Sequence, residues 1–515
     1  MRPFLRTVLA VILAFIALLI LHAPLLRLPW FWDEAGYYIP AALDFYHAGR
    51  LVPASTQAIG HTPLVMVYLG LVWHVLGYSV WAGRAALTLI AAATVVALYA
   101  LARRVAGREA AISSALLLAV SPLFFAQTTL AHLDLAVALF TTLAVLFLIE
   151  DRFWAFALAA SLAVLSKETA VVLLPVAWLY VRQLRGLTDS RSNQLRTCTA
   201  LATPLVPLAA WTLYYHHATG YWTGNRDYLS YNVYSTLSVA RVFLSLLRRG
   251  YELFVSGFNW VLTAGALWGW WRVRRNSKLE RRNSDAGSRN PCPVSRVPSP
   301  VFLAAGLMAA YLLLLSLVGG AILPRYLLPV LPLFYLVMVA WVRCLPPIPA
   351  RLVLSVAAVC FVSAWFINPP YPFPFEDNLA YADFVRLHQQ AARYLETRPA
   401  EARILTAWPA SDELTKPALG YVERPLRVGA VPGFALQDFS GVRLESFELL
   451  YLYSRRWEPP GNWVERFPAW LRWQERYFDY HPQVAADALA TRLRLRPLWQ
   501  ADRRGQWVRI YAVVP

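Results

Sequence analysis

Long apolar runs separated by short polar segments fill the chain as far as residue 366. A helix needs about 20 apolar residues to cross a hydrocarbon core of about 30 Å, so such runs predict membrane spans. They predict about eleven spans, at residues 8–21, 84–102, 110–124, 135–148, 153–165, 169–181, 198–215, 253–271, 301–318, 326–342 and 352–366. Several runs are short for a span, and the pair on either side of Lys167 could form one re-entrant hairpin. The expected fold class is a mainly α, polytopic helical membrane protein.

The pattern changes after the last apolar run. The Pro-rich segment 368–375 cannot continue a helix and predicts a stiff extended linker. Beyond it the sequence predicts helices at 383–397, 463–477 and 484–493, a strand at 404–408, and a hairpin at 498–513 that turns near Gly505. We therefore expect a transmembrane domain at 1–368 and a small extracytoplasmic α+β domain at 369–515.

The basic residues indicate how the spans are oriented. They form three clusters between apolar runs, namely Arg103, Arg104 and Arg108, then Arg182, Arg185, Arg191 and Arg196, then Arg272, Arg274, Arg275, Lys278, Arg281, Arg282 and Arg289. The positive-inside rule places such clusters in the cytoplasm. Segment 64–76 is apolar enough for a span. If it crossed the membrane, however, the next span would deliver the first basic cluster to the outer side. We expect instead a long first external loop at about 27–83, with interfacial helices at 37–48 and 64–76.

Composition supports a membrane protein and narrows its partners. The chain is 58% hydrophobic and 15% charged, with a mean hydropathy of +0.44, which excludes an ordinary soluble globule. Its net charge is +18. Because the basic residues lie in loops beside apolar runs, this charge indicates membrane orientation and no nucleic-acid partner. We expect a multi-pass membrane protein.

An acidic pair, Asp33-Glu34, follows the first apolar run within the aromatic segment WFWDEAGYY at 30–38. Trp and Tyr rings prefer the headgroup region, so the pair is expected at the lipid-water boundary of the outer face. The same topology brings to that face His61, Asp134, Lys167, Glu168, His216, His217, Arg226, Arg325 and Tyr326. Carboxylates, imidazoles and cations gathered between helices suit a transfer from a phosphate-bearing lipid.

Each of these residues also has a simpler interpretation. The acidic pair could cap the following helix, and so could Asp134. Arg325 could extend to lipid headgroups, and Lys167 could be neutralised by Glu168 or Asp134. A histidine at a membrane boundary, such as His61, is more often a hydrogen-bonding residue than a metal ligand.

Taken in order, the motifs resemble those of the C-type (GT-C) membrane glycosyltransferases. The set consists of WDEA (32–35), HTPL (61–64), Ser121-Pro122 followed by Asp134, SKE (166–168) and PRYLLP (324–329). Within that class the chain is similar to the superfamily of protein O-mannosyltransferases and lipid A aminoarabinose transferases, over roughly residues 5–345. The tail after Phe366 carries no comparable match.

The resemblance implies an inverting transfer of a sugar from a polyprenyl-phosphate-linked donor to an acceptor at the outer, extracytoplasmic face of the inner (plasma) membrane. The acceptor is a lipid, a glycan or a protein. Asp33 matches the acidic residue of the first external loop and would be the catalytic base, with Glu34 positioning it or the acceptor. The candidates for binding substrate or its phosphate are His61, Asp134, Lys167, Arg226, Arg325 and Tyr326.

No cofactor is expected to be required, although a divalent metal held by His61, His216 or His217 stays possible. The aminoarabinose transferases carry an acidic-basic pair where this chain has His61, which puts a metal role like theirs in doubt. Two other functions stay open. One is an oligosaccharide transferase or ligase that uses a pyrophosphate-linked glycan, and the other is a transporter or flippase of lipid-linked sugars. The first loop has no D-x-D signature, and no repeated pair of broken helices is evident.

Overall fold

The computed structural model describes residues 3–185, 191–226, 229–230, 233–234, 237–280, 300–318, 320–458, 466–478 and 485–513. The helical part contains α1 Pro3–Leu21, η1 Glu34–Tyr38, α2 Ile39–Ala48, α3 Leu64–Leu76, α4 Val80–Ala106, α5 Arg108–Val120, α6 Pro122–Gln127, α7 Leu133–Ile149, α8 Phe153–Ser166, η2 Glu168–Val172, α9 Leu173–Arg185, α10 Arg191–Ala202, α11 Leu205–Thr219, α13 Val239–Phe254, η4 Ser256–Phe258, α14 Asn259–Glu280, α15 Pro300–Leu317, η5 Pro324–Val330, α16 Leu331–Val342 and α17 Pro347–Ala364.

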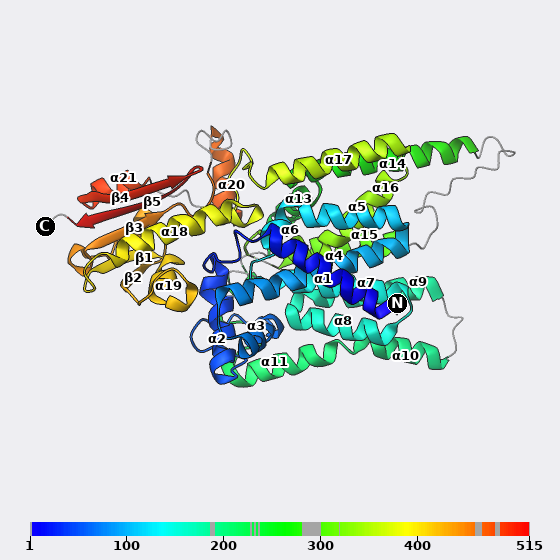
Figure 1. Ribbon diagram of the computed structural model, residues 1–515, viewed down its shortest axis with the longest axis horizontal. Helices are drawn as coiled ribbons and strands as arrows, with labels where there is room; N and C mark the ends of the chain where they lie inside the picture. Colours follow the sequence, from blue (N-terminus) through cyan, green and yellow to red (C-terminus); the bar gives the residue numbers. More distant parts are fainter. Residues whose placement is uncertain are drawn as a thin grey trace.

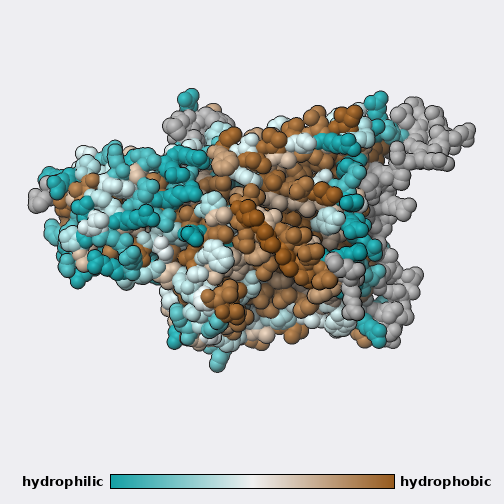
Figure 2. Space-filling view, in the orientation of Figure 1, coloured by the Kyte–Doolittle hydropathy of each residue, from teal (hydrophilic) through white to brown (hydrophobic). Residues whose placement is uncertain are grey.

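These helices form an elongated bundle, and a smaller α/β part sits at one end of it (Figure 1). The surface of the bundle carries a broad hydrophobic band, with hydrophilic surface on the α/β part and at the opposite end of the helices (Figure 2). A band of this kind between two polar ends is the surface that a lipid bilayer requires. The fold is that of a multi-pass membrane protein.

Five stretches of helix in the described part of the chain are long and apolar enough to cross a membrane. They are Phe4–Leu21, Val80–Ala106, Pro300–Leu317, Pro324–Val342 and Pro347–Ala364. Helices α3, α7 and α8 are apolar but shorter. The expected total of eleven spans stays a prediction.

Proline residues divide two of the expected spans. The expected span 110–124 is split at Ser121, where Pro122 begins α6. The expected span 198–215 is wrong as a single helix, because α10 ends at Ala202 and α11 begins after Pro204. Proline has no N–H to donate to the preceding turn, so an apolar run that contains it need not be one helix.

One of the helices that the sequence analysis missed is α13. Its charged residues interrupt the apolar pattern, among them Arg241, Arg249 and Glu252. A span was expected to begin at Leu253, but this residue is the last buried residue of α13. The next long helix, α14, starts at Asn259, after a break at Gly257. An amphipathic helix shows no continuous apolar run, so a search for spans passes over it.

The first loop carries the two helices that were expected. Helix α2 ends at Gly49 with φ 65° and packs beside α3. Helix α3 has 13 residues and is therefore about 20 Å long, shorter than a hydrocarbon core. That length favours an interfacial position, which stays a prediction.

The C-terminal part contains η6 Phe375–Asp377, α18 Ala380–Glu396, β1 Arg403–Ala407, α19 Ala410–Thr415, η7 Pro417–Leu419, β2 Arg427–Val431, η8 Leu436–Phe439, η9 Leu444–Ser446, β3 Leu449–Tyr453, α20 Pro468–Phe478, α21 Ala486–Arg492, β4 Leu495–Arg503 and β5 Gln506–Val513. The strands form one sheet in the order β2-β1-β3-β5-β4. Strands β1, β2 and β3 are parallel to their neighbours in that group, and β5 is antiparallel to β3 and β4. The expected strand at 404–408 and the hairpin near Gly505 are present, whereas β2 and β3 were not expected.

One hydrophobic core joins the C-terminal part to the first long loop, residues 27–83. It contains Trp30 and Phe31 from the loop together with Tyr381 and Phe384 from α18 and Tyr453 from β3. The two parts therefore share a core, and the boundary expected at 368/369 stays a prediction.

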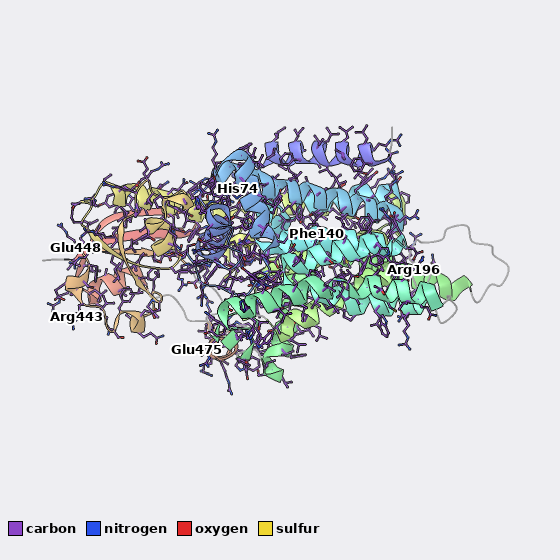
Figure 3. The ribbon with its side chains drawn as sticks, turned by 90° about the horizontal axis from the view of Figure 1, so that it is seen from below. His74, Phe140, Arg196, Arg443, Glu448 and Glu475 are labelled. Atoms are coloured by element: carbon purple, nitrogen blue, oxygen red, sulfur yellow. The ribbon has the colours of Figure 1, made fainter. Side chains whose placement is uncertain are left out.

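The basic clusters lie away from the sheet. Arg196 lies at the end of the bundle opposite to Arg443 and Glu448, with Phe140 between them (Figure 3). The N-terminus and the C-terminal ends of α9 and α14 also lie at that far end (Figure 1). Arg281, Arg282 and Arg289 of the third cluster fall outside the described residues.

Candidate active site

The turn that carries Asp33 follows α1 and has an unusual backbone. Trp32 adopts φ 47°, a left-handed conformation that is rare for an aromatic residue, and a π-helical turn begins at Glu34. The rings of Phe384 and Trp408 pack on Trp32, each with its centroid 5.5 Å away. Strained backbone held by surrounding packing, like a π-turn, is typical of functional sites.

Glu34 is fully buried and its carboxylate binds only protein groups. It accepts hydrogen bonds from the backbone N–H of Phe31 at 2.7 Å and of Ala131 at 2.5 Å, and it pairs with Arg84 Nη2 at 3.3 Å. Arg84 also donates to the carbonyls of Leu28 and Thr129 at 2.8 and 2.6 Å. Burial raises the pKa of Glu34, and Arg84 opposes this shift. Glu34 thus fixes the turn that presents Asp33.

Asp33 faces the other way, toward Arg325. Its carboxylate forms an ion pair with Arg325 Nη2 and is 18% exposed, while the Arg325 side chain is 2% exposed. Arg325 Nη1 donates to Glu376 Oε2 at 2.6 Å and lies 3.0 Å from His132 Nε2. Burial, opposed by Arg325, raises the pKa of Glu376 to about 7. One buried guanidinium therefore joins the first long loop to η6, which precedes the sheet.

Three cations surround the ring of Tyr326. Lys167 Nζ lies 4.1 Å from the ring centroid, and the Cζ atoms of Arg325 and Arg249 lie 5.4 and 5.8 Å from it. Lys167 also pairs with Asp134 at 2.8 Å, as one of the simpler interpretations expected. A group of cations this dense and this buried suits a ligand with concentrated negative charge, such as a phosphate.

Of the two guanidinium groups in this cluster, Arg249 has the more unused donors, two nitrogens against the single Nε of Arg325. Arg249 is fully buried, and its Nε donates to the Leu315 carbonyl at 3.2 Å. Its Nη1 and Nη2 have no hydrogen-bond partner among the described residues. Burial lowers the pKa of Arg249. A buried cation with unused donors is costly, and an anionic ligand would satisfy it.

The structure does not bring the remaining candidates into this cluster. His61 Nδ1 contacts Glu168 at 3.0 Å, and Arg226 is exposed. His216 stacks on Trp222 with ring centroids 3.9 Å apart, and His217 is exposed. In the part of the chain that the structure describes, no group of three or more His, Cys, Asp or Glu side chains is placed to hold a metal ion.

Four residues of the site were not singled out in the sequence, namely Arg84, His132, Arg249 and Glu376. Arg84 lies inside an apolar span, and a charge in such a span is itself a signal for a partner. Arg249 lies on the amphipathic α13, and Glu376 follows a Pro-rich segment that reads as a linker. Nothing in the local sequence of Glu376 or His132 indicates their approach to Arg325.

Comparisons with known proteins agree with this architecture. The sequence profile of the family described as dolichyl-phosphate-mannose-protein mannosyltransferase matches residues 60–214. The crystal structure of ArnT from Cupriavidus metallidurans bound to undecaprenyl phosphate is 15% identical, with a TM-score of 0.57 over 98% of this chain and 97% of that chain. The same protein in the apo state is 15% identical, with a TM-score of 0.56 over 97% of each chain. A search of curated proteins gave no significant match.

The helical bundle, the site at its sheet-bearing end and the likeness to ArnT over nearly the whole length of both chains lead to one conclusion. The chain has the fold of the C-type (GT-C) membrane glycosyltransferases.

Proposed function

We propose that the chain is an inverting glycosyltransferase that transfers a sugar from a polyprenyl-phosphate-linked donor to an acceptor at the outer face of the inner membrane. The observation that carries this proposal is the position of Asp33, a partly exposed carboxylate paired with the edge of a buried cation cluster. A base next to a phosphate-binding group is the minimum that such a transfer needs.

The cation cluster would bind the phosphate of the donor. Arg249 offers two free Nη groups, Arg325 offers a guanidinium fork, and Lys167 adds a third charge at the same ring. As the bond between sugar and phosphate breaks, negative charge grows on the departing phosphate. Fixed cations in a site that excludes water stabilise that charge more than water does. Tyr326 would hold the cations at the spacing that the phosphate requires.

Asp33 would act on the acceptor. In a direct displacement the acceptor hydroxyl attacks the anomeric carbon on the face opposite to the phosphate, and a base removes its proton. The configuration at that carbon is inverted. Asp33 is the partly exposed carboxylate of the Arg325 group, whereas Glu376 is 4% exposed, so Asp33 is the one that an acceptor reaches. General-base catalysis contributes about 10²- to 10⁴-fold in rate.

The membrane topology completes the proposal. The basic clusters would face the cytoplasm, so the site and the C-terminal part would lie outside. ArnT has been solved with undecaprenyl phosphate, which supports a lipid carrier of the same chemical class as the donor here. We propose no resident metal, and the identities of the sugar and acceptor are for experiment to determine.

The test is donor consumption by the purified full-length protein in lipid nanodiscs. A panel of labelled polyprenyl-phosphate sugars is offered with a membrane extract that supplies acceptors, and product anomers are assigned by NMR. We expect consumption of one donor with inversion at the anomeric carbon. A parallel reaction with EDTA should run at the same rate.

Other outcomes would favour the other functions. Consumption only of pyrophosphate-linked glycans, abolished by EDTA, would indicate an oligosaccharide transferase. Movement of a lipid-linked sugar across the membrane without bond cleavage would indicate a flippase. Either result would overturn the proposal.

A further inference from the structure

A cavity of about 300 Å³ lies beside the active site but apart from it. Its walls come from α13, η4, the start of α14 and the segment 367–378, with further residues from 121–123, from η5 and α16 and from the end of α17. Most of its lining is apolar, including Leu253, Phe258 and Phe373. Asp33, Arg325 and Glu376 do not line it, although the flanking residues Pro324 and Asp377 do. Cavities of this size commonly hold small ligands.

Two carboxylates in this apolar wall have unused acceptors. The Glu252 side chain is 6% exposed, and its Oε1 accepts from Arg248 at 3.2 Å. Its Oε2 and the Oδ1 of Asp377 are buried without a hydrogen-bond partner among the described residues. Buried acceptors left unpaired cost about 1–3 kcal/mol each, so both atoms indicate a missing donor.

The charges around these two carboxylates indicate which kind of hydrogen-bond donor is missing. Burial raises the pKa of Glu252, opposed by Arg248 and Arg249, and burial with the charges of Glu376 and Glu252 raises the pKa of Asp377, opposed by Arg248. Arg248 forms an ion pair with Glu252, whereas Asp377 has no ion-pair partner among the described residues, so a cationic ligand is favoured over the phosphate of a polyprenyl carrier. An ammonium group supplies both the positive charge and the N–H donors.

The mouth of the cavity indicates where the ligand comes from. Val255, Trp260 and Ile367 line the cavity and are 41%, 52% and 59% exposed. They lie just after α13, at the start of α14 and just beyond the end of α17, an apolar span. Exposed aliphatic and aromatic residues at a helix end face the boundary between lipid chains and headgroups.

We propose that this cavity is an accessory lipid site that binds a membrane lipid with a primary ammonium headgroup, through Glu252 and Asp377. The apolar wall takes the upper part of the lipid chain, and the two carboxylates accept hydrogen bonds from the ammonium. The site goes beyond the proposed transfer reaction, since neither carboxylate forms a hydrogen bond or ion pair with Asp33, Arg325 or Tyr326 among the described residues, although the charges of Arg249 and Arg325 act on them.

The test uses the full-length protein in phosphatidylcholine nanodiscs doped with photoactivatable lipids. Phosphatidylethanolamine carries the ammonium, phosphatidylcholine has the same charge without N–H donors, and phosphatidylglycerol has hydroxyls without the cation. We expect phosphatidylethanolamine to label peptides from 251–260 and 367–378 at least about 10-fold more than either other lipid. Glu252→Gln and Asp377→Asn should each reduce that labelling to the phosphatidylcholine level, and Asp502→Asn should not.

Thermal unfolding in the same nanodiscs separates loss of binding from loss of folding. Unlabelled phosphatidylethanolamine should raise the Tm of the wild type and leave the Tm of both variants unchanged. Asp377→Asn should unfold no earlier than the wild type in phosphatidylcholine alone, because a neutral amide is cheaper to bury than an unpaired carboxylate, whereas Glu252→Gln also loses its ion pair with Arg248 and should unfold slightly earlier. Equal labelling by all three lipids, stronger labelling by phosphatidylglycerol, or labelling that survives in both variants would overturn the proposal. None of these readouts needs sugar transfer, so failure of the proposed enzymatic function would leave them interpretable.

Discussion

At the scale of single residues, protonation of Glu376 makes the neutralisation of the Arg325 charge depend on pH. Arg325 is shared between Asp33 and Glu376, and the pKa of Glu376 is raised to about 7 by burial, against the opposing effect of Arg325. Below that pH Glu376 gains a proton and stops neutralising Arg325. A guanidinium with one carboxylate partner attracts a phosphate more strongly than one with two.

We therefore expect the KM for the donor to rise as pH increases from 6 to 8. Glu376→Gln should keep the low-pH value of KM throughout this range, because its amide cannot ionise. Steady-state kinetics on the wild type and the variant measure this difference, and Asp502→Asn is the matched surface control. A variant that keeps the wild-type pH dependence would rule Glu376 out as its source.

Arg249 provides a second test at this scale. Its two unpartnered Nη groups are expected to bind the donor phosphate, and a charge-assisted hydrogen bond is worth about 1.5–3 kcal/mol. Arg249→Gln should raise the donor KM about 10- to 100-fold with a smaller effect on kcat, whereas Arg104→Gln, at an exposed position after an apolar span, should change neither. An unchanged KM in Arg249→Gln would remove this residue from the phosphate site.

The sequence analysis identified some residues of this site and missed others. Asp33, Lys167 and Arg325 were found because each places a charge beside apolar runs, where a charge without a partner is energetically costly. Glu376 and His132 reach Arg325 only through tertiary packing, from positions 51 and 193 residues away. No local pattern encodes such a contact.

At the scale of elements, the buried pair of Glu34 and Arg84 ties the turn after α1 to α4. Arg84→Met would leave Glu34 without its cation, and removing one partner of a buried pair costs about 3–5 kcal/mol. Burial already raises the pKa of Glu34, and without Arg84 this pKa would rise further. A carboxyl with a raised folded-state pKa stabilises the protein at low pH, and that contribution is lost as pH rises through the folded pKa.

Arg84→Met should therefore unfold at a lower temperature than the wild type, by a margin that grows from pH 5 to pH 8. The double variant Glu34→Gln with Arg84→Met removes the lone charge and should recover part of the loss at pH 8. Thermal unfolding in nanodiscs measures all three proteins. A double variant less stable at pH 8 than Arg84→Met alone would contradict a buried charge as the cause.

The predicted and observed element boundaries agree where the local sequence signal is strong. The hairpin of β4 and β5 turns at Gly505, with φ 82°, as its pattern predicted. Strands β2 and β3 were both missed, and β3 is buried along its whole length. A short strand buried on both faces shows no alternation.

At the scale of the whole molecule, the account requires one orientation in the membrane. The sheet and Arg196 lie at opposite ends of the bundle (Figure 3). A cysteine at Asp502 in a strand of the sheet should react with an impermeant maleimide in intact cells, and a cysteine at Arg104 only after permeabilisation. The unsubstituted chain gives the background from its natural cysteines. The reverse pattern would place the site in the cytoplasm and contradict the proposed location.

The measurement that tests the central claim most directly is single-turnover transfer with Asp33→Asn, using the donor identified from the panel. The amide keeps the shape of Asp33 but cannot accept the proton of the acceptor hydroxyl. We expect a rate at least about 10²-fold below wild type with the donor still bound, while Asp502→Asn stays at the wild-type rate. A wild-type rate in Asp33→Asn would show that another group is the base.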